Sequence, residues 1–368
     1  MILLFIIFLT IFVFMLQKRM MKSSLDVIRE NYWPEKNIVD PEETFDLVIS
    51  MENIGKYYIP YVKAQLFCPK EIRVCVEDDH VTKDAERGGR FVTWSTWLRA
   101  YQEAQYRVPV SIGERGQYVL PKLRVFGGDF LGMEETSRDF SKYREIVVAP
   151  REVPESEFRE LLGSFLGEHS VRRFLYEDPI LTIGYREYIG REPMKMISWK
   201  QSARGNGLMV KKYDYTLEPM ASVLLNVESK TDDWEQRLEQ CFSLTRTVCR
   251  ILEDRGIKYD FYTNAMMAGN MWSVQEVGEG LGHRHFSSVL ECLGRAAYKA
   301  TFSCSRLLEK ATAVSEMNRA RILITPGNDL TEPENYAALY RLEEISGENL
   351  FIIKASDIMF SGKPEDAT

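Results

Sequence analysis

The sequence predicts a multidomain protein in which an N-terminal membrane helix is followed by a β-sandwich and then by an α/β doubly wound domain. Three observations predict this order: an apolar run at the start of the chain, short alternating segments up to about residue 150, and strands separated by helix-length segments beyond residue 220. With 368 residues, 45% of them hydrophobic, the chain is long enough to form several compact cores.

The first element is a membrane anchor over residues 1–22. Met1 to Leu16 contains Thr10 as its only clearly polar side chain, and cations close the run at Lys18, Arg19 and Lys22. As a helix this run spans about 24 Å, between the apolar core of a signal peptide and a full span of about 30 Å. The charges follow the run and no small-residue cleavage site is present, which favours an anchor. The positive-inside rule predicts a single-pass protein of the cell membrane with its bulk in the cytoplasm; the alternatives are a buried core helix or an uncleaved signal.

The next segment, 27–150, predicts a small β-sandwich. Apolar and polar residues alternate in short runs such as 44–49 and 105–110, and Gly, Pro and Asn separate the runs. Period-two alternation between turn residues is typical of half-buried strands. Asp129 follows two glycines and is interpreted as a turn residue rather than an acid catalyst.

Residues 151–219 form a linker and a basic, aromatic region. A helix is expected over 154–167, where apolar residues recur at helical spacing. For 183–212 the pattern predicts a strand, a Gly/Pro turn, a short helix and another strand. Its mixture of cations and aromatic rings can hold an anion, a nucleic-acid strand or an acidic partner surface. The alternative is a solvated basic face around a buried Trp199.

The last region, 220–358, alternates strands and helices. Strands are expected at 221–227, 257–263, 320–325 and 350–354, and helices at 233–255, 287–299 and 333–345. Such crossovers predict a parallel sheet with helices on both faces. Function in these sheets lies at the carboxyl ends of strands, so the positions after Val227, Thr263 and Thr325 are the informative ones. Cys241 and Cys249 are expected to be buried thiols.

The basic, aromatic region resembles the signature of the family called domain of unknown function 58. The residues that carry the likeness are Tyr185, Tyr188, Gly190, Ile197, Trp199, Lys200, Ala203, Arg204, Gly207 and Leu208. The chain departs from the family pattern in Gly190-Arg191, where the family has Gly-Asp, and in Lys195 near the usual arginine. The order of anchor, β-domain, motif and final domain is similar to the family's, so the likeness covers nearly the whole chain.

This resemblance implies that residues 220–358 form a von Willebrand factor A-like domain. A metal-binding domain of that kind needs Asp-x-Ser-x-Ser after its first strand, because hard oxygen ligands must converge on one Mg²⁺. Here Asn226, Glu228 and Lys230 occupy these positions, and a lysine opposes a cation. The sequence therefore predicts a degenerate site that binds no metal.

Composition excludes several function classes. A net charge of −7 argues against a general nucleic-acid binder, and the six cysteines include no CxxC pair. No nucleophile elbow or phosphate-binding loop is present, and no cofactor is expected. His283 and His285 lie in a Gly-rich stretch without carboxylates at metal-ligand spacing.

These observations predict a non-enzymatic, membrane-anchored interaction or scaffold protein. Its predicted binding residues are Tyr185, Tyr188, Gly190, Trp199, Lys200, Ala203 and Arg204. The resemblance implies a partnership with a MoxR-type AAA+ ATPase in envelope or complex assembly in bacteria. The alternative is a hydrolase or transglutaminase-associated enzyme whose site lies in the β-domain or in the loop of His283 and His285, with activity that is sensitive to the loss of either histidine.

Overall fold

The computed structural model separates the chain into two compact units, Met1–Pro150 and Arg151–Thr368. It describes residues 8, 12, 15, 25–75, 80–84, 88–120, 122–128, 135–140, 142–154, 182–188, 197–204, 207–213, 220–229, 234–269, 275–313, 319–327, 330 and 332–357. The expected helix over 154–167 lies almost wholly outside these residues, as does most of the expected anchor. Within the described part of the chain, no helix is both long and apolar enough to cross a membrane.

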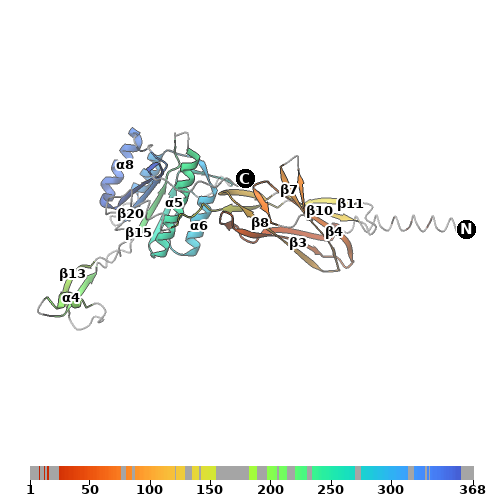
Figure 1. Cartoon of the computed structure of the whole chain (residues 1–368), viewed down its shortest axis with the longest axis horizontal. Coiled ribbons are helices and arrows are strands. Elements are labelled where there is room, and N and C mark those ends of the chain that lie inside the picture. Colours follow the sequence, from red (N-terminus) through yellow and green to blue (C-terminus); the bar gives the residue numbers. More distant parts are fainter. Residues whose placement is uncertain are drawn as a thin grey trace. The chain divides into compact units, whose positions relative to one another are not determined.

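The first unit is the β-sandwich that the alternating segments predict (Figure 1). Its strands are β1 (Ile28–Pro34), β2 (Ile38–Val39), β3 (Thr44–Asn53), β4 (Ile59–Cys68), β5 (Ile72–Val74), β6 (Val81–Asp84), β7 (Gly89–Leu98), β8 (Glu103–Ile112), β9 (Gly116–Leu120), β10 (Leu123–Gly128), β11 (Glu135–Phe140) and β12 (Arg144–Val148). They form sheets with the orders β1-β3-β8-β5, β11-β10-β4-β7-β6 and β2-β12-β9.

Strand β4 shows why these residues form a sandwich. Every second side chain of the strand, Val62, Ala64, Leu66 and Cys68, is fully buried, while the residues between them are partly exposed. A strand directs successive side chains to opposite faces, so this alternation covers one core with one face of the sheet. The core combines residues of all three sheets.

The second unit contains a mixed sheet with the order β18-β16-β15-β20-β21. Its elements are β15 (Met220–Leu225), α5 (Trp234–Asp254), β16 (Lys258–Thr263), β17 (Ala265–Met267), β18 (Glu276–Gly280), α6 (His283–Arg295), β19 (Ala296–Ala300), α7 (Cys304–Ala313), β20 (Arg319–Thr325), α8 (Pro333–Ser346) and β21 (Leu350–Lys354). Strands β16, β15, β20 and β21 are parallel, and β18 is an antiparallel edge.

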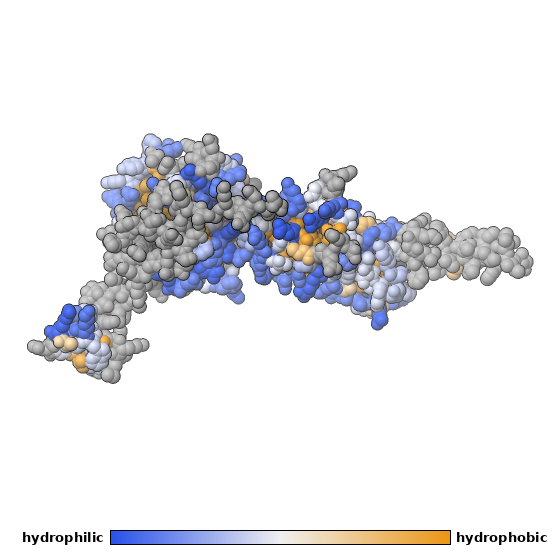
Figure 2. Space-filling model, in the orientation of Figure 1, coloured by the Kyte–Doolittle hydropathy of each residue, from blue (hydrophilic) through white to orange (hydrophobic). Residues whose placement is uncertain are grey.

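Helices cover both faces of this sheet, as the sequence predicts. Val223 of the central strand packs in a core with α5 and α6, whereas its neighbour Leu224 packs in a separate core with α7 and α8. Cys241 and Cys249 of α5 are fully buried, which confirms their expected place in the core. Hydrophilic side chains cover most of the described surface seen in Figure 2, and apolar residues gather in a patch on the β-sandwich.

Several elements of the second unit differ from the prediction. The helix expected at 287–299 begins earlier, at His283, and ends at Arg295, because residues Ala296–Ala300 form strand β19. Ala265 and Met267 of β17 pair with Ala300 and Ala296. This non-local pairing overrides the helical propensity of a segment rich in alanine. Helix α7 and strands β17 and β18 have no counterpart among the predicted elements. The antiparallel β18 makes the sheet mixed rather than wholly parallel.

Candidate functional site

The segment that carries Trp199 folds as a two-stranded hairpin with one helical turn. We call it the motif hairpin, and it comprises β13 (Thr182–Glu187), α4 (Trp199–Ser202) and β14 (Met209–Tyr213). The two strands pair antiparallel, with Glu187 opposite Met209. Ile197 forms an isolated bridge to Val210, and both residues are buried. Paired strands and a small apolar contact therefore define the hairpin.

Hydrogen bonds of two serines connect the helical turn α4 to strand β14. The Ser202 hydroxyl donates to the carbonyl oxygen of Ser198 over 2.9 Å and accepts from the amide of Met209 over 2.8 Å. The amide of Ser198 in turn donates to the carbonyl oxygen of Met209, also over 2.8 Å. These bonds fix α4 against β14, so the side chains that leave the turn start from a defined backbone.

The predicted binding residues of this turn all face solvent. Trp199 is 60% exposed, and Lys200, Ala203 and Arg204 are exposed as well. Lys200 lies within α4, and Arg204 follows Ala203, the residue that caps this turn. The interpretation of a buried tryptophan within a basic face is therefore wrong. A large exposed apolar ring among cations is characteristic of interaction surfaces.

The remaining predicted residues of the motif are distributed as follows. Tyr185 is exposed on β13, and Tyr188, which follows that strand, is half-buried; its amide donates to the carbonyl oxygen of Leu208 over 2.8 Å. Gly190 lies outside the described residues. The structure thus assembles Tyr185, Tyr188 and the α4 residues on one hairpin.

A second group of polar residues meets at the carboxyl ends of β15, β16 and β20. Asn226, Asn264 and Thr325 follow or end these strands, and all three are fully buried. The Asn226 amide nitrogen donates to the Thr325 hydroxyl over 3.0 Å, and its oxygen accepts from the Asn264 amide over 2.8 Å. The backbone amide of Val227 donates to the Asn264 side-chain oxygen over 2.9 Å. We call these residues the carboxyl-edge cluster.

Glu228 also forms hydrogen bonds at this edge of the sheet. Its carboxylate accepts the backbone amide of Cys304, the first residue of α7, over 2.8 Å, and its own amide donates to the Asn226 side-chain oxygen over 3.0 Å. A carboxylate at the start of a helix satisfies an amide that has no partner within the helix. Protein donors therefore engage the Asn226 side-chain oxygen and the Glu228 Oε2 atom. Lys230 lies outside the described residues.

The described residues contain no group of three histidine, cysteine, aspartate or glutamate side chains placed to hold a metal ion. The carboxyl-edge cluster offers two amides and a hydroxyl, which are weaker ligands for a hard cation than carboxylates. An amide is both donor and acceptor, so Asn226 and Asn264 link three strand ends without a charge.

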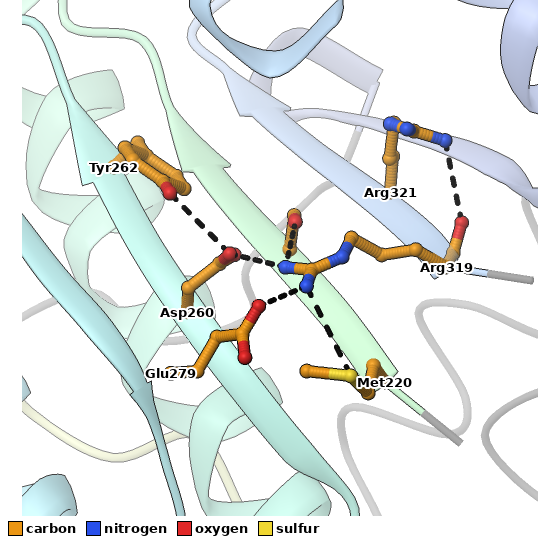
Figure 3. Close-up of polar contacts among 7 residues, drawn as sticks. Met220, Asp260, Tyr262, Glu279, Arg319 and Arg321 are labelled. Atoms are coloured by element: carbon orange, nitrogen blue, oxygen red, sulfur yellow. Dashed lines mark hydrogen bonds and ion pairs between the residues drawn. The ribbon is translucent and has the colours of Figure 1, made fainter. Parts of the chain in front are cut away.

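Ionised side chains gather on the sheet near the amino ends of its strands (Figure 3). Fully buried Arg319 forms ion pairs with Asp260 and Glu279 and donates to the Ser222 hydroxyl over 3.2 Å. Arg321 donates to the Ser346 hydroxyl of α8 over 3.2 Å. These contacts join β15, β16, β18, β20 and α8. They form a network that is distinct from the carboxyl-edge cluster, and we call it the arginine network.

Burial changes the acid-base properties of this network. Desolvation raises the pKa of Asp260, against the lowering by the Ser222 hydrogen bond and by Arg319. Desolvation together with the Asp260 charge raises the pKa of Tyr262 to about 12. Perturbed carboxylates also occur in active sites, but here one arginine bridges both acids, as in a structural ion-pair network.

The two histidines of the enzyme alternative lie in α6 rather than in a loop. His283 is exposed, whereas the His285 ring packs edge-on against Tyr259, with ring centroids 4.6 Å apart. Desolvation lowers the pKa of His285, and its Nε2 is buried with no hydrogen-bond partner among the described residues. The two side chains do not share an environment, so they do not form a paired acid-base site.

Comparisons with known proteins do not assign the chain to a family. No family model matches the sequence, and no curated protein matches it. Among solved structures, a cohesin module of a family 33 glycoside hydrolase from Clostridium perfringens has 17% identity and a TM-score of 0.24, covering 33% of this chain and 96% of that chain. A type II cohesin domain from the cellulosome of Acetivibrio cellulolyticus has 9% identity and a TM-score of 0.23, covering 33% and 95%. These are β-sandwich modules, and at such scores the likeness carries no functional argument.

The prediction that the positions after the strand ends are informative includes Asn264, which directly follows Thr263, but the sequence did not indicate that Asn264 pairs with Asn226. Sequence reasoning also missed the arginine network. The sequence contained a signal for that network: Arg319 and Arg321 alternate with apolar residues in one strand, and Asp260 lies between apolar residues in another. Charged residues within buried strands require partners.

Proposed function

We propose that this protein is a non-enzymatic, membrane-anchored interaction or scaffold protein that binds its partner through the motif hairpin. The partner class is a AAA+ ATPase of the MoxR type, and the role is in envelope or complex assembly. The bulk of the chain is cytoplasmic, and its final domain is von Willebrand factor A-like. The observation that carries the proposal is the exposure of Trp199 beside Lys200 and Arg204 on a turn fixed by hydrogen bonds.

The chemistry of the motif hairpin suits a protein surface that carries acidic residues. Trp199 supplies a large apolar contact area, and tryptophan and arginine dominate binding energy in protein interfaces. Lys200 and Arg204 supply charge that an acidic partner surface complements. A fixed turn reduces the conformational entropy lost on binding.

The architecture of the second unit favours a scaffold function over an enzymatic one. Its parallel sheet is covered by helices on both faces, and the carboxyl edge, where such sheets commonly hold ligands, is closed by hydrogen bonds among Asn226, Asn264 and Thr325. That arrangement is compatible with a metal-free A-like domain that presents binding surfaces.

The proposal is tested by purifying the tagged full chain from detergent-solubilised membranes, with and without ATP. We expect a AAA+ ATPase to co-purify with the wild-type chain. The variant Lys200→Glu/Arg204→Glu reverses the charge at the hairpin and should lower recovery of the ATPase at least about tenfold, since each charged contact at an interface contributes on the order of 1 kcal/mol or more.

The matched control is Arg284→Glu/Lys299→Glu, which makes the same charge change at two exposed positions of the same unit. Recovery should stay at the wild-type level in this control. Circular dichroism must show that both variants are folded. Equal loss in the two variants, or a wild-type chain that captures no ATPase, contradicts the proposal.

A further inference from the structure

Two loops at one end of the β-sandwich expose aromatic side chains together. The β3–β4 loop carries Ile54, Tyr57 and Tyr58, and Trp97 and Tyr101 flank the β7–β8 turn; all five are exposed, Tyr57 by 68% and Tyr101 by 73%. The rings of Tyr58 and Trp97 lie 6.0 Å apart between centroids, so the two loops are in contact. We call these residues, with Lys56 and Arg99, the aromatic platform.

Hydrogen bonds of one buried side chain connect the two loops of the platform. Asn53 is fully buried at the end of β3, and its amide nitrogen donates to the carbonyl oxygens of Tyr57 and Arg99, each over 2.8 Å. Its side-chain oxygen accepts from the amide of Gly55 over 2.9 Å. One residue thus links both loops, which therefore present their aromatic rings as a single surface.

Tyr101 has a backbone conformation that its side chain does not favour. Its φ of 56° lies in the left-handed region, where a bulky residue is uncommon and glycine or asparagine is preferred. Core packing does not explain a tyrosine here, because the side chain is largely in water. A strained position occupied by an exposed aromatic ring points to a role for the ring itself.

The platform adjoins the place where the N-terminal segment joins the β-sandwich. Leu25 is buried in the core, and the carbonyl oxygen of Val27 accepts the amide of Ile54 over 2.9 Å. The chain that precedes Leu25 contains the apolar run ending at Leu16. The nine residues from 17 to 25 reach at most about 30 Å when extended. A bilayer holding the apolar run therefore lies within reach of the platform.

The side chains of the platform suit the interface of a bilayer. Tyrosine and tryptophan concentrate at the level of lipid headgroups because their rings are apolar and their edges are polar. Lys56 lies over the Tyr57 ring at 5.2 Å, and Arg99 over the Trp97 ring at 5.4 Å. Residues 54–58 and 97–102 contain no acid, although Asp26 and Glu103 are exposed nearby. Cations beside the anchor attract anionic lipids.

We propose that the aromatic platform docks on the headgroup region of the membrane that holds the N-terminal segment, and so fixes the β-sandwich against that membrane. This inference rests on the proposed membrane anchoring. Docking by rigid aromatic loops beside an anchor limits the orientations of the β-sandwich, which a flexible tether alone does not do.

The test reconstitutes the full chain into vesicles of equal parts phosphatidylcholine and phosphatidylglycerol, with lipids brominated near the headgroup, which quench tryptophan fluorescence on contact. We expect quenching in the wild-type chain that falls about twofold or more in Trp97→Phe. Trp199→Phe is the matched control, because Trp199 is also exposed but lies on the motif hairpin; its quenching should equal that of the wild type. Lys56→Glu/Arg99→Glu should also reduce quenching by weakening attraction to the anionic headgroups.

Flotation of the vesicles separates the two proposals. A chain that floats, but whose quenching does not depend on Trp97, retains its anchor and overturns docking by the platform. A chain that does not float overturns both the anchoring and the docking. Quenching that depends on Trp199 instead of Trp97 assigns membrane contact to the hairpin. If the fluorescence of Trp97 changes only when a protein partner is added, the platform is a protein interface, and the proposal is equally overturned.

Discussion

At the scale of single residues, two buried amides decide the character of the carboxyl edge. The Asn226 side-chain oxygen accepts from the Asn264 amide and from the backbone amide of Glu228, and its nitrogen donates to Thr325. The Asn264 side-chain oxygen accepts from the backbone amide of Val227. A carboxylate in place of Asn226 lacks the amide donor and adds a buried charge, which requires a cation or a proton. Neutral amides close the edge without either.

Asn264→Ala should destabilise the second unit by about 1–3 kcal/mol. The substitution leaves the amide of Val227 and the side-chain oxygen of Asn226 short of a partner in a buried site. Chemical denaturation measures the change. Glu344→Ala, an exposed position on α8, is the control and should change stability by less than about 0.5 kcal/mol. Equal effects in the two variants would show that the cluster is not a stabilising element.

His285 should make the stability of the second unit depend on pH. Its pKa is lowered by burial, so the folded state binds fewer protons than the unfolded state below the unfolded pKa of about 6.5. The contribution of His285 is complete above that pH and is lost as the pH falls through the folded pKa. Denaturation midpoints of wild type and His285→Gln, compared between pH about 7 and 5, should diverge, with the variant less sensitive to acid. His283→Gln, at an exposed position two residues earlier, should follow the wild type; if it diverges equally, burial of His285 is not the cause.

At the scale of elements, ion pairs of the buried Arg319 join strands that are otherwise largely apolar. Arg319 connects β20 to β16 and β18 through Asp260 and Glu279. The arginine network also contacts the end of α8, because Arg321 donates to the Ser346 hydroxyl. It therefore fixes the packing of a helix on the sheet as well as the order of the strands.

Arg319→Met should destabilise the second unit by about 3–5 kcal/mol, because it leaves Asp260 buried without the cation that pairs with it. Adding Asp260→Leu should recover part of the loss, since an apolar pair replaces an uncompensated charge. Urea titrations of the two variants measure both effects. Lys310→Met breaks the exposed pair with Glu276 in the same unit and should cost less than about 1 kcal/mol. A double variant less stable than Arg319→Met would contradict this account of the network.

At the scale of the whole molecule, separate hydrophobic cores stabilise the two units. Among the residues that the structure describes, the β-sandwich core is formed by residues of Met1–Pro150, and the two cores of the α/β domain are formed by residues of Arg151–Thr368. Units with separate cores unfold as separate cooperative steps unless an interface couples them.

Calorimetry of the full chain should therefore resolve two transitions. Leu66→Ala in the β-sandwich and Leu244→Ala in α5 each remove a fully buried side chain and should each lower stability by about 2–5 kcal/mol. Each variant should shift one transition only, and the two should shift different ones. A single transition moved by both substitutions would show that the units unfold together.

The sequence by itself determined the order of the β-sandwich and the α/β domain, because alternation of period two and helix-length crossovers are local patterns. It also located the carboxyl edge and the basic, aromatic motif. Only the tertiary structure decided that Trp199 is exposed, that Ala296–Ala300 is a strand and that Asn264 completes the carboxyl-edge cluster. It alone joined the aromatic loops through Asn53. The physical reason is that exposure, strand pairing and side-chain hydrogen bonds depend on residues far apart in the chain, which no local pattern records.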